Sequence, residues 1–325
     1  MQTRLIDQIS DAAEILRRGG LVAFATETVF GLGADARSGE AIERLFAAKG
    51  RPSDNPLIVH LSDMAQYRLA ARELPPMAEK ILRAFSPGPV TVVLPKSSEI
   101  CPSVTAGLDS VGIRIPAAAA ARELLRVAGI PIAAPSANLS GRPSCTTWQS
   151  VLEDLDGRID AILTLPAPHV GLESTVVDCT GPIPLLLRPG AISLDDLQRI
   201  VPTARQSSDP AASRASPGLR HPHYQPSVPV VLIHALDDWD SRQAEGQAVA
   251  YCGMDLPSGS QNFSFIQQFD SVETYAQGFY EFLRAADRAG VDFILVQSAR
   301  GPGLAAALFD RQSRAAGGAA NCELP

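Results

Sequence analysis

The chain has 325 residues, of which 46% are hydrophobic, and its formal net charge is −7. This length predicts two domains, and this apolar fraction is sufficient to form hydrophobic cores. The acidic balance argues against a protein whose main role is to bind nucleic acid, although it leaves room for a local phosphate site.

The cysteines and the N-terminus both favour a cytoplasmic protein. The five cysteines are scattered and form no CxxC pair, so they indicate neither a disulfide framework nor a zinc site. A reducing cytosol suits such cysteines best. The N-terminus has no apolar signal core, and no run of 18 apolar residues occurs. We therefore expect a soluble protein that is not held by a membrane.

The first 201 residues predict interleaved strands and helices. A first helix ends at the glycine pair 19–20, with inward positions Ile6, Ile9, Ala13 and Leu16. A short buried strand at 21–25 follows, and Ser38 caps a second helix that runs to about Lys49. Later apolar runs predict strands at 56–61, 90–95, 111–116, 131–135, 161–165, 175–179 and 184–188, with helices at 76–85, 118–128 and 193–200. This order is typical of an α/β domain built on a large, twisted, mixed sheet.

Composition changes near Val201. Residues 202–227 are rich in Pro, Ser, Ala and Arg, which indicates a linker. Its second half holds more chemistry than a spacer needs, namely His221, His223 and Tyr224. Residues 228–325 predict a small Rossmann-like α/β domain, with buried parallel strands at 228–234, 248–254 and 291–298 and helices around Tyr275–Ala286 and after the glycines at 301 and 303. A full GxGxxG loop is missing there, so this domain carries no nucleotide signature.

Two candidate cations lie at the end of the second predicted helix. Lys49 and Arg51 flank the glycine that ends this helix and precede the strand at 56–61. Two cations on a rigid turn suit a polyanion such as a nucleoside triphosphate. A basic helix end is also a favourable charge at the negative end of the helix dipole, and the local sequence does not decide between the two.

Polar side chains also follow other predicted strands. The segment TETVFGLG, residues 26–33, reads as a loop that lets a ligand approach the backbone. Arg114 lies inside an apolar run and needs either a protein carboxylate or a ligand anion as its partner. APSANLSG at 134–141, Glu173 to Thr175, and Arg188 stand at further strand ends, whereas a lone His60 in an apolar run is more often a core residue. Such clustering is typical of a binding crevice in an open α/β sheet.

These segments, in this order, resemble the YrdC-type domain. The matching stretches are TETVFGLG, KGRPSDNPLIVH, SPGPVTVVLP, VGIRIP, APSANLSGRPS, ESTVVD and LLRPG. The linker SPGLRHPHYQP and the C-terminal unit resemble the longer, two-domain form of the family, the L-threonylcarbamoyladenylate synthases. The resemblance implies synthesis of threonylcarbamoyl-AMP and pyrophosphate from L-threonine, bicarbonate and Mg²⁺-bound ATP. It also implies a downstream transferase that passes the threonylcarbamoyl group to adenosine next to the tRNA anticodon, without stable nucleic-acid binding by this chain.

The resemblance implies a role for each matching residue. The L-threonine positions are Thr28, His60, Arg114, Ala134 and Ser174. The ATP positions are Arg51, Asn55, Ser110, Ser136, Ser144, Arg188 and the linker residue Tyr224. Lys49 and Arg51 are expected to act on the phosphates, and no residue is assigned to a metal. The sequence departs from the family pattern at Ala25, Phe30, Ala118 and Pro222, and Pro222 stands in the linker where the family usually has an arginine.

Two other functions compete with this one. YrdC-type domains also act in carbamoyl transfer during hydrogenase maturation, but such proteins carry zinc-finger-like and acylphosphatase regions that this chain lacks. An RNA-binding YrdC-like module without adenylate-forming activity is the alternative from another class. The acidic net charge and the lack of interleaved aromatic and basic residues argue against it.

Overall fold

The computed structural model describes residues 2–165, 169–208, 223–236, 239, 246–257 and 263–317. Its first part is an 11-stranded sheet in the order β1-β8-β2-β3-β7-β4-β6-β5-β9-β10-β11. The strands are β1 (Arg4–Ile6), β2 (Val22–Ala25), β3 (Phe30–Asp35), β4 (Ile58–His60), β5 (Val90–Pro95), β6 (Ser110–Arg114), β7 (Ile132–Ala133), β8 (Ala161–Leu163), β9 (Thr175–Asp178), β10 (Leu185–Arg188) and β11 (Arg205–Gln206). Parallel and antiparallel pairs both occur, so the predicted mixed sheet is confirmed.

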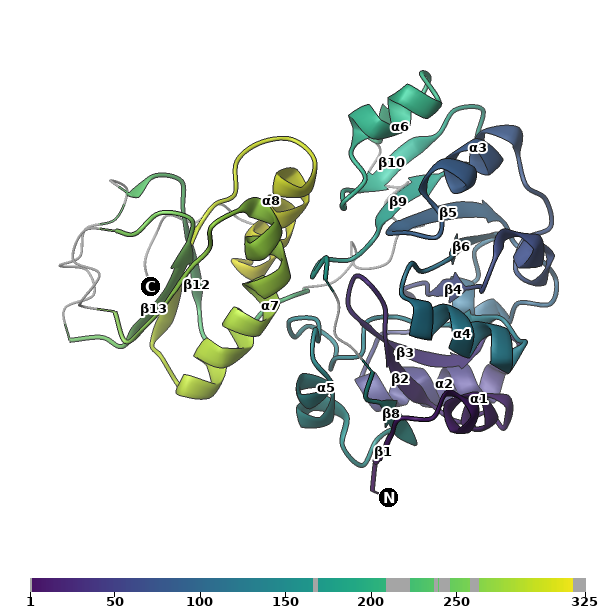
Figure 1. The fold of residues 1–325 in the computed structure, drawn as a ribbon, viewed down its shortest axis with the longest axis horizontal. Helices are drawn as coiled ribbons and strands as arrows, with labels where there is room; N and C mark the ends of the chain where they lie inside the picture. Colours follow the sequence, from purple (N-terminus) through teal and green to yellow (C-terminus); the bar gives the residue numbers. More distant parts are fainter. Residues whose placement is uncertain are drawn as a thin grey trace.

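Helices cover both faces of this sheet (Figure 1). They are α1 (Ile9–Arg17), α2 (Gly39–Lys49), α3 (Pro76–Phe85), α4 (Ala119–Ala128), α5 (Trp148–Leu155) and α6 (Leu194–Ile200), with the short 3₁₀ helices η1 (Met64–Leu69) and η2 (Pro102–Thr105). Successive side chains of β2 point to opposite faces of the sheet. Val22 and Phe24 accordingly belong to the core that contains α1 and α4, whereas Ala23 belongs to the core on the other face, which contains α2 and α3.

The predicted ends of α2 are confirmed. The Ser38 side chain accepts a hydrogen bond from the backbone N–H of Ala41, at 3.2 Å, and so caps the helix. Gly50 ends the helix in the left-handed conformation, with φ at 59°. This glycine turns the chain so that Arg51 leaves the helix toward the strand ends, while Lys49 stays on the last helical turn.

The sequence predictions were wrong at two places in the first 40 residues. Ile6 belongs to β1, where it pairs with Leu163, and the helix begins only at Ile9. The segment 26–33 is not a loop throughout, because β3 starts at Phe30 and pairs antiparallel with β2. Position 33 of this strand must be a glycine, because a Cβ there would lie 2.9 Å from the ring of Phe24. The sequence predictions also missed β1, β11, α5 and β14.

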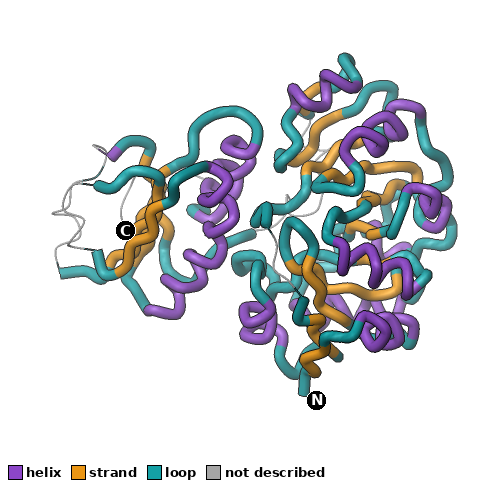
Figure 2. Tube along the Cα trace, viewed as in Figure 1, coloured by secondary structure: helices purple, strands orange, loops and turns teal. Residues whose placement is uncertain are grey.

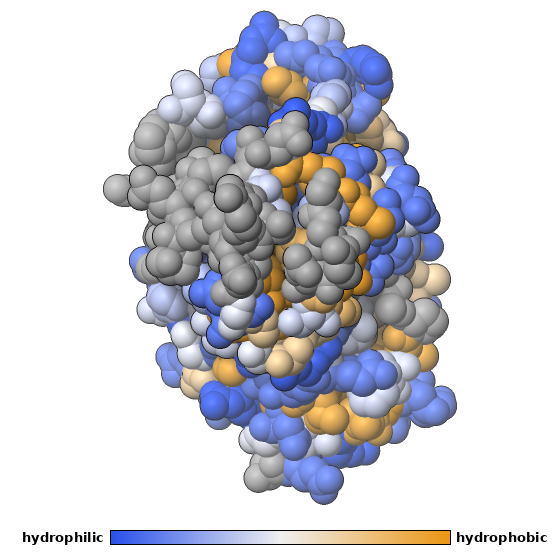
Figure 3. Space-filling model, turned by 90° about the vertical axis from the view of Figure 1, so that its left-hand side faces the viewer, coloured by the Kyte–Doolittle hydropathy of each residue, from blue (hydrophilic) through white to orange (hydrophobic). Residues whose placement is uncertain are grey.

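The second part is a four-stranded parallel sheet in the order β12-β15-β13-β14. Its elements are β12 (Val230–Ile233), β13 (Val249–Gly253), β14 (Phe265–Gln268), β15 (Phe293–Gln297), α7 (Val272–Ala289) and α8 (Leu304–Ala315). Figures 1 and 2 show α7 and α8 on the face of this sheet that is turned toward the first part. Figure 3 views the opposite side, where hydrophobic residues gather near the middle and polar residues lie toward the ends. The predicted small α/β domain with parallel strands is therefore confirmed.

The two parts pack directly against each other. Arg284 of α7 donates to Asp154 of α5 at 2.8 Å, and both side chains are buried. The backbone of α7 also approaches Gly171 so closely that a Cβ there would lie 2.4 Å from the Cα of Gln277. The predicted linker 202–227 contains β11 near its start. His221 and Pro222, which the sequence analysis singled out, and Cys322, one of the five cysteines, lie outside the described residues.

Candidate active site

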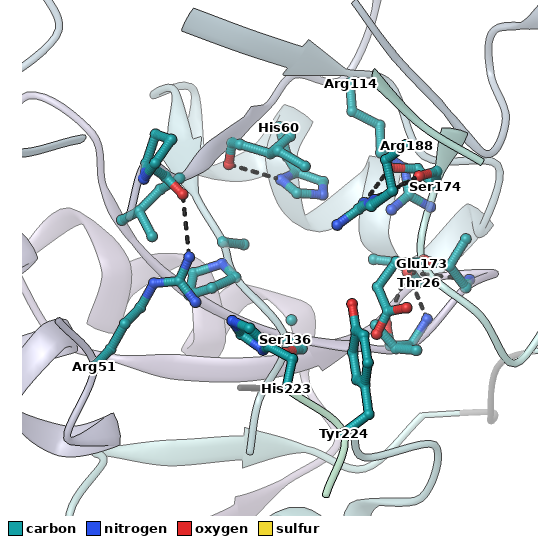
Figure 4. Close-up of a pocket in the computed structure, with 18 residues that line it drawn as sticks. Thr26, Arg51, His60, Arg114, Ser136, Glu173, Ser174, Arg188, His223 and Tyr224 are labelled. Atoms are coloured by element: carbon teal, nitrogen blue, oxygen red, sulfur yellow. Dashed lines mark hydrogen bonds between the residues drawn. The ribbon is translucent and has the colours of Figure 1, made fainter. Parts of the chain in front are cut away.

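A pocket forms where β2, β4, β6, β7 and β10 end, and the linker residues His223 and Tyr224 also line it (Figure 4). Most of the predicted site residues line it, namely Thr28, Arg51, His60, Arg114, Ala134, Ser136, Ser174, Arg188 and Tyr224. The cavity volume is about 60 Å³, which holds only a few water molecules. Strand ends far apart in sequence are thus brought to one place, as the sequence analysis expected.

Lys49 does not line the pocket. Its Nζ atom is buried and donates to the backbone carbonyl of Ser136 at 2.6 Å and to that of Asn138. Burial, together with the nearby Arg51, lowers the pKa of Lys49 to about 7. The two hydrogen bonds hold its amino group on the turn that follows β7, so Lys49 shapes the wall that contains Ser136.

Three of the predicted ATP residues also lie outside the pocket lining. Asn55 is buried behind the wall, and its Nδ2 atom lies 3.4 Å from Nε2 of His223. Ser144 is buried and donates to Oε1 of Glu173 at 2.6 Å. Ser110 begins β6 opposite Pro95 and is partly exposed. The roles of these residues stay predictions.

Arg114 forms an internal ion pair and also lines the pocket. Its Nη2 atom donates to Oε1 of Glu27 at 2.6 Å, with both side chains buried. The other carboxylate oxygen of Glu27 accepts from the backbone N–H of Ala117 at 2.9 Å. Burial favours the protonated form of Glu27, but Arg114 outweighs burial and lowers the pKa of this carboxyl. The Nε atom of Arg114 is buried with no hydrogen-bond partner among the described residues.

His60 offers the pocket a neutral imidazole. Its Nδ1 atom lies 3.3 Å from the carbonyl oxygen of Ile58, and a carbonyl only accepts, so this nitrogen carries the proton. Burial and the positive charge of Arg114 lower the pKa of His60 to about 3. The ring therefore stays uncharged at neutral pH and keeps Nε2 as a hydrogen-bond acceptor.

Two further guanidinium groups stand on opposite sides of the pocket (Figure 4). Arg51 donates to the carbonyl of Pro56 at 3.2 Å, and its Nε atom is buried without a described partner. Burial lowers the pKa of Arg51 to about 10, so the group remains charged at neutral pH. Arg188 donates to the backbone carbonyl of Ser174 at 3.0 Å. Such a pair suits an anion with several oxygens, such as a polyphosphate.

Glu173 connects the pocket to the second domain. Its Oε2 atom accepts from the hydroxyl of Tyr280 at 3.0 Å and from Nε of Arg311 at 2.8 Å. The sequence analysis singled out Glu173 but missed Tyr280 and Arg311. Both lie on amphipathic helices, where an arginine is ordinarily read as solvent-facing and a tyrosine as part of the core.

The Glu173 carboxylate is expected to make the protein sensitive to acid. Burial alone would raise its pKa, but Arg311 and Arg188 outweigh burial and hold the pKa at about 2, against 4.5 for a free side chain. The unfolded chain therefore binds a proton that the folded chain does not, and stability falls as the pH is lowered through this window. We expect a loss on the order of 3 kcal/mol between pH 5 and pH 2 from this group.

Urea unfolding at a series of pH values measures this effect. Glu173→Gln keeps the shape of the side chain but has no titrating proton, so its free energy of unfolding should be lower at pH 7 and should change less with pH. Parallel profiles for the two proteins would show that the ion pair contributes nothing to acid sensitivity.

Known proteins resemble this chain over nearly its whole length. Residues 14–190 match the family model described as "Telomere recombination", and residues 192–317 match "Threonylcarbamoyl-AMP synthase, C-terminal domain". Threonylcarbamoyl-AMP synthases of Bacillus subtilis and Pyrococcus abyssi are 39% and 40% identical, over 96% and 95% of this chain and 93% and 94% of theirs. The solved structure of P. abyssi Sua5 in complex with L-threonine is 37% identical, covers 98% of both chains and superposes with a TM-score of 0.89.

Proposed function

Because the chain belongs to the threonylcarbamoyl-AMP synthase family, we propose that this pocket joins L-threonine, bicarbonate and ATP into threonylcarbamoyl-AMP and pyrophosphate. The observation that carries the proposal is one pocket that combines a buried, neutral His60 and Arg114 with the guanidinium groups of Arg51 and Arg188. The side with His60 and Arg114 suits an amino acid, and the side with Arg51 and Arg188 suits phosphates.

The amino-acid side of the pocket is built around Arg114. Glu27 fixes one edge of its guanidinium, which leaves the unpartnered Nε to meet the carboxylate of L-threonine. His60 accepts a hydrogen bond from the amine or the hydroxyl of the substrate. Thr28, Ala134 and Ser174 complete this part of the wall.

The nucleotide side of the pocket is closed in this structure. Arg51, Ser136 and Arg188 line it, together with His223 and Tyr224. ATP is far larger than the cavity, so the nucleotide side of the pocket must widen to admit it. Asn55 contacts His223, and Ser144 donates to Glu173. We therefore assign Asn55 and Ser144 an indirect role, in which they position His223 and Glu173 beside the nucleotide. We assign the same supporting role to Lys49, through the turn that contains Ser136.

The reaction needs little general acid–base catalysis by the protein. The neutral amine of L-threonine combines with bicarbonate to give a carbamate and water, and a carbamate oxygen then attacks the α-phosphorus of ATP. Pyrophosphate leaves, and negative charge accumulates on the phosphoryl oxygens. Arg51 is charged at neutral pH, and a guanidinium such as that of Arg188 is not deprotonated in proteins. Both line the pocket and stabilise this charge, since fixed cations in a buried site need no reorganisation.

Mg²⁺ enters this proposal as part of the ATP substrate. The described residues hold no group of three or more His, Cys, Asp or Glu side chains arranged for a metal. The pocket carboxylate, Glu173, is already engaged by Arg311, Tyr280 and Ser144. The residues present therefore fit a magnesium ion that is bound mainly by phosphate oxygens, as is usual for nucleotide complexes.

The cellular context is also a proposal. The product is a reactive mixed anhydride, so we expect a downstream enzyme to consume it. The family resemblance implies that this enzyme is a transferase that modifies tRNA. The described helices include none that is long and apolar enough to cross a membrane. The cysteines in the described part of the chain, Cys101, Cys145, Cys179 and Cys252, are free, which supports a reducing compartment such as the cytoplasm.

Pyrophosphate release by the purified protein tests the proposed function. We expect release with Mg-ATP only when L-threonine and bicarbonate are both present, with threonylcarbamoyl-AMP formed in equal amount. Release that continues without either substrate would contradict the proposal. Salt-sensitive tRNA binding without any release would instead favour the RNA-binding module.

A further inference from the structure

The second domain contributes directly to the wall around the linker tyrosine. Tyr224 is buried, and Figure 4 shows its hydroxyl pointing into the pocket. Its ring stacks on Tyr280 of α7, with centroids 5.4 Å apart and an interplanar angle of 28°. The guanidinium of Arg311, from α8, lies over the same ring at 5.6 Å. These two partners come from the C-terminal domain, while the neighbouring linker residue His223 contacts the same ring at a centroid distance of 5.4 Å.

The same two residues hold the pocket carboxylate. Tyr280 and Arg311 both donate to Oε2 of Glu173, while Ser144 occupies Oε1. Arg311 is fully buried and also donates to the carbonyl of Pro189, which directly follows Arg188 at the end of β10. One arginine thus links Glu173, Tyr224 and the segment that carries Arg188.

The backbone of Tyr224 needs such support. Its φ is +68°, a left-handed conformation that a tyrosine rarely adopts. The next residue, Gln225, donates its backbone N–H to the carbonyl of Gly141 at 2.8 Å. A strained residue at a functional site persists only where its surroundings fix it, and here the ring is fixed by Tyr280 and Arg311.

From these contacts we infer that Arg311 and Tyr280 are positioning residues for the adenylate-forming site, acting through Glu173 and the ring of Tyr224. The inference rests on the proposed function and extends it, because it assigns part of the active site to the C-terminal domain. Arg311 orients Glu173 and Tyr224 together, so the closed pocket depends on α7 and α8. A domain that only stabilised the fold would have no such effect on the rate.

A double-mutant cycle in the full-length protein tests the inference. The values of kcat/KM for ATP are measured for the unaltered protein, Arg311→Gln, Glu173→Gln and the double variant, together with thermal unfolding. Each single change should lower kcat/KM by about 10-fold or more. The double variant should be no slower than the slower single variant, because both changes remove the same contact.

Arg288→Ala is the matched control. Arg288 also joins the two domains, through Glu153 at 3.1 Å, but it is exposed and touches no pocket residue. Its kcat/KM should stay within about twofold of the unaltered protein. A folded Arg311→Gln variant with unchanged kcat/KM, or multiplicative losses in the double variant, would overturn the inference.

A milder variant covers the case in which Arg311→Gln does not fold. Tyr280→Phe keeps the ring on Tyr224 and removes only the hydroxyl that donates to Glu173. A several-fold loss of kcat/KM at an unchanged unfolding temperature supports the inference, and no loss contradicts it. The proposed function is judged separately, because its failure would leave the unaltered protein unable to form threonylcarbamoyl-AMP at all.

Discussion

Replacing Arg114 with alanine should lower kcat/KM for L-threonine about 100-fold or more, with a much smaller change in the ATP requirement. The loss corresponds to about 3 kcal/mol, which is typical when one partner of a buried, hydrogen-bonded charge pair is removed. The reason is geometric, because Arg114 lines the pocket and keeps a buried Nε without a described partner. Initial rates of pyrophosphate release, measured against each substrate in turn, give both requirements.

Arg114→Lys separates substrate binding from folding. Alanine would leave Glu27 as a buried charge without its partner, whereas lysine keeps a positive charge beside it. Lysine lacks the planar fork of a guanidinium, so a carboxylate is gripped less well and the loss should be intermediate. Equal rises in the L-threonine and ATP requirements for either variant would contradict the role assigned to Arg114.

The sequence was sufficient for most of the fold because its signals are local. β5 and α3 occupy their predicted ranges, Val90–Pro95 and Pro76–Phe85, since an unbroken apolar run and a regular helical spacing define them. β3 was predicted to be a loop because Gly31 and Gly33 are residues typical of turns. Gly33 is required by the ring of Phe24 on the neighbouring strand, and a Cβ at Gly31 would lie 3.3 Å from the Cβ of Ala134, contacts that local sequence does not contain.

The site was harder to predict than the fold, because a sequence motif places a residue near the site without showing whether its side chain points into the pocket. Ser136 and Ser144 stand in the same stretch, yet Ser136 lines the pocket and Ser144 turns to Glu173. Lys49 was expected on phosphates and instead holds backbone carbonyls. Arg311 pairs with a residue 138 positions earlier, so only the packing of the two domains reveals its role.

Arg284 forms a buried ion pair between the two domains. Its guanidinium donates to both carboxylate oxygens of Asp154, at 3.2 and 2.8 Å, and to the carbonyl of Pro143 at 2.5 Å. Both members of the pair are almost fully buried. Breaking a buried pair by removing one partner typically costs about 3–5 kcal/mol, because the remaining charge has lost its compensation.

We therefore expect Arg284→Met to lower the free energy of unfolding by about 3 kcal/mol, at the lower end of this range. Asp154 would keep two partners, the backbone N–H of Leu139 and the guanidinium of Arg142, each at 2.9 Å. Urea unfolding measures the change, and Arg288→Ala, which removes an exposed pair across the same contact, should cost less than about 1 kcal/mol. Equal losses in the two variants would show that burial of the Arg284 pair adds nothing to docking. A large loss for Arg284→Met, accompanied by slower pyrophosphate release from the folded variant, would mean that docking of α7 and catalysis depend on the same contact surface, since α7 also carries Tyr280.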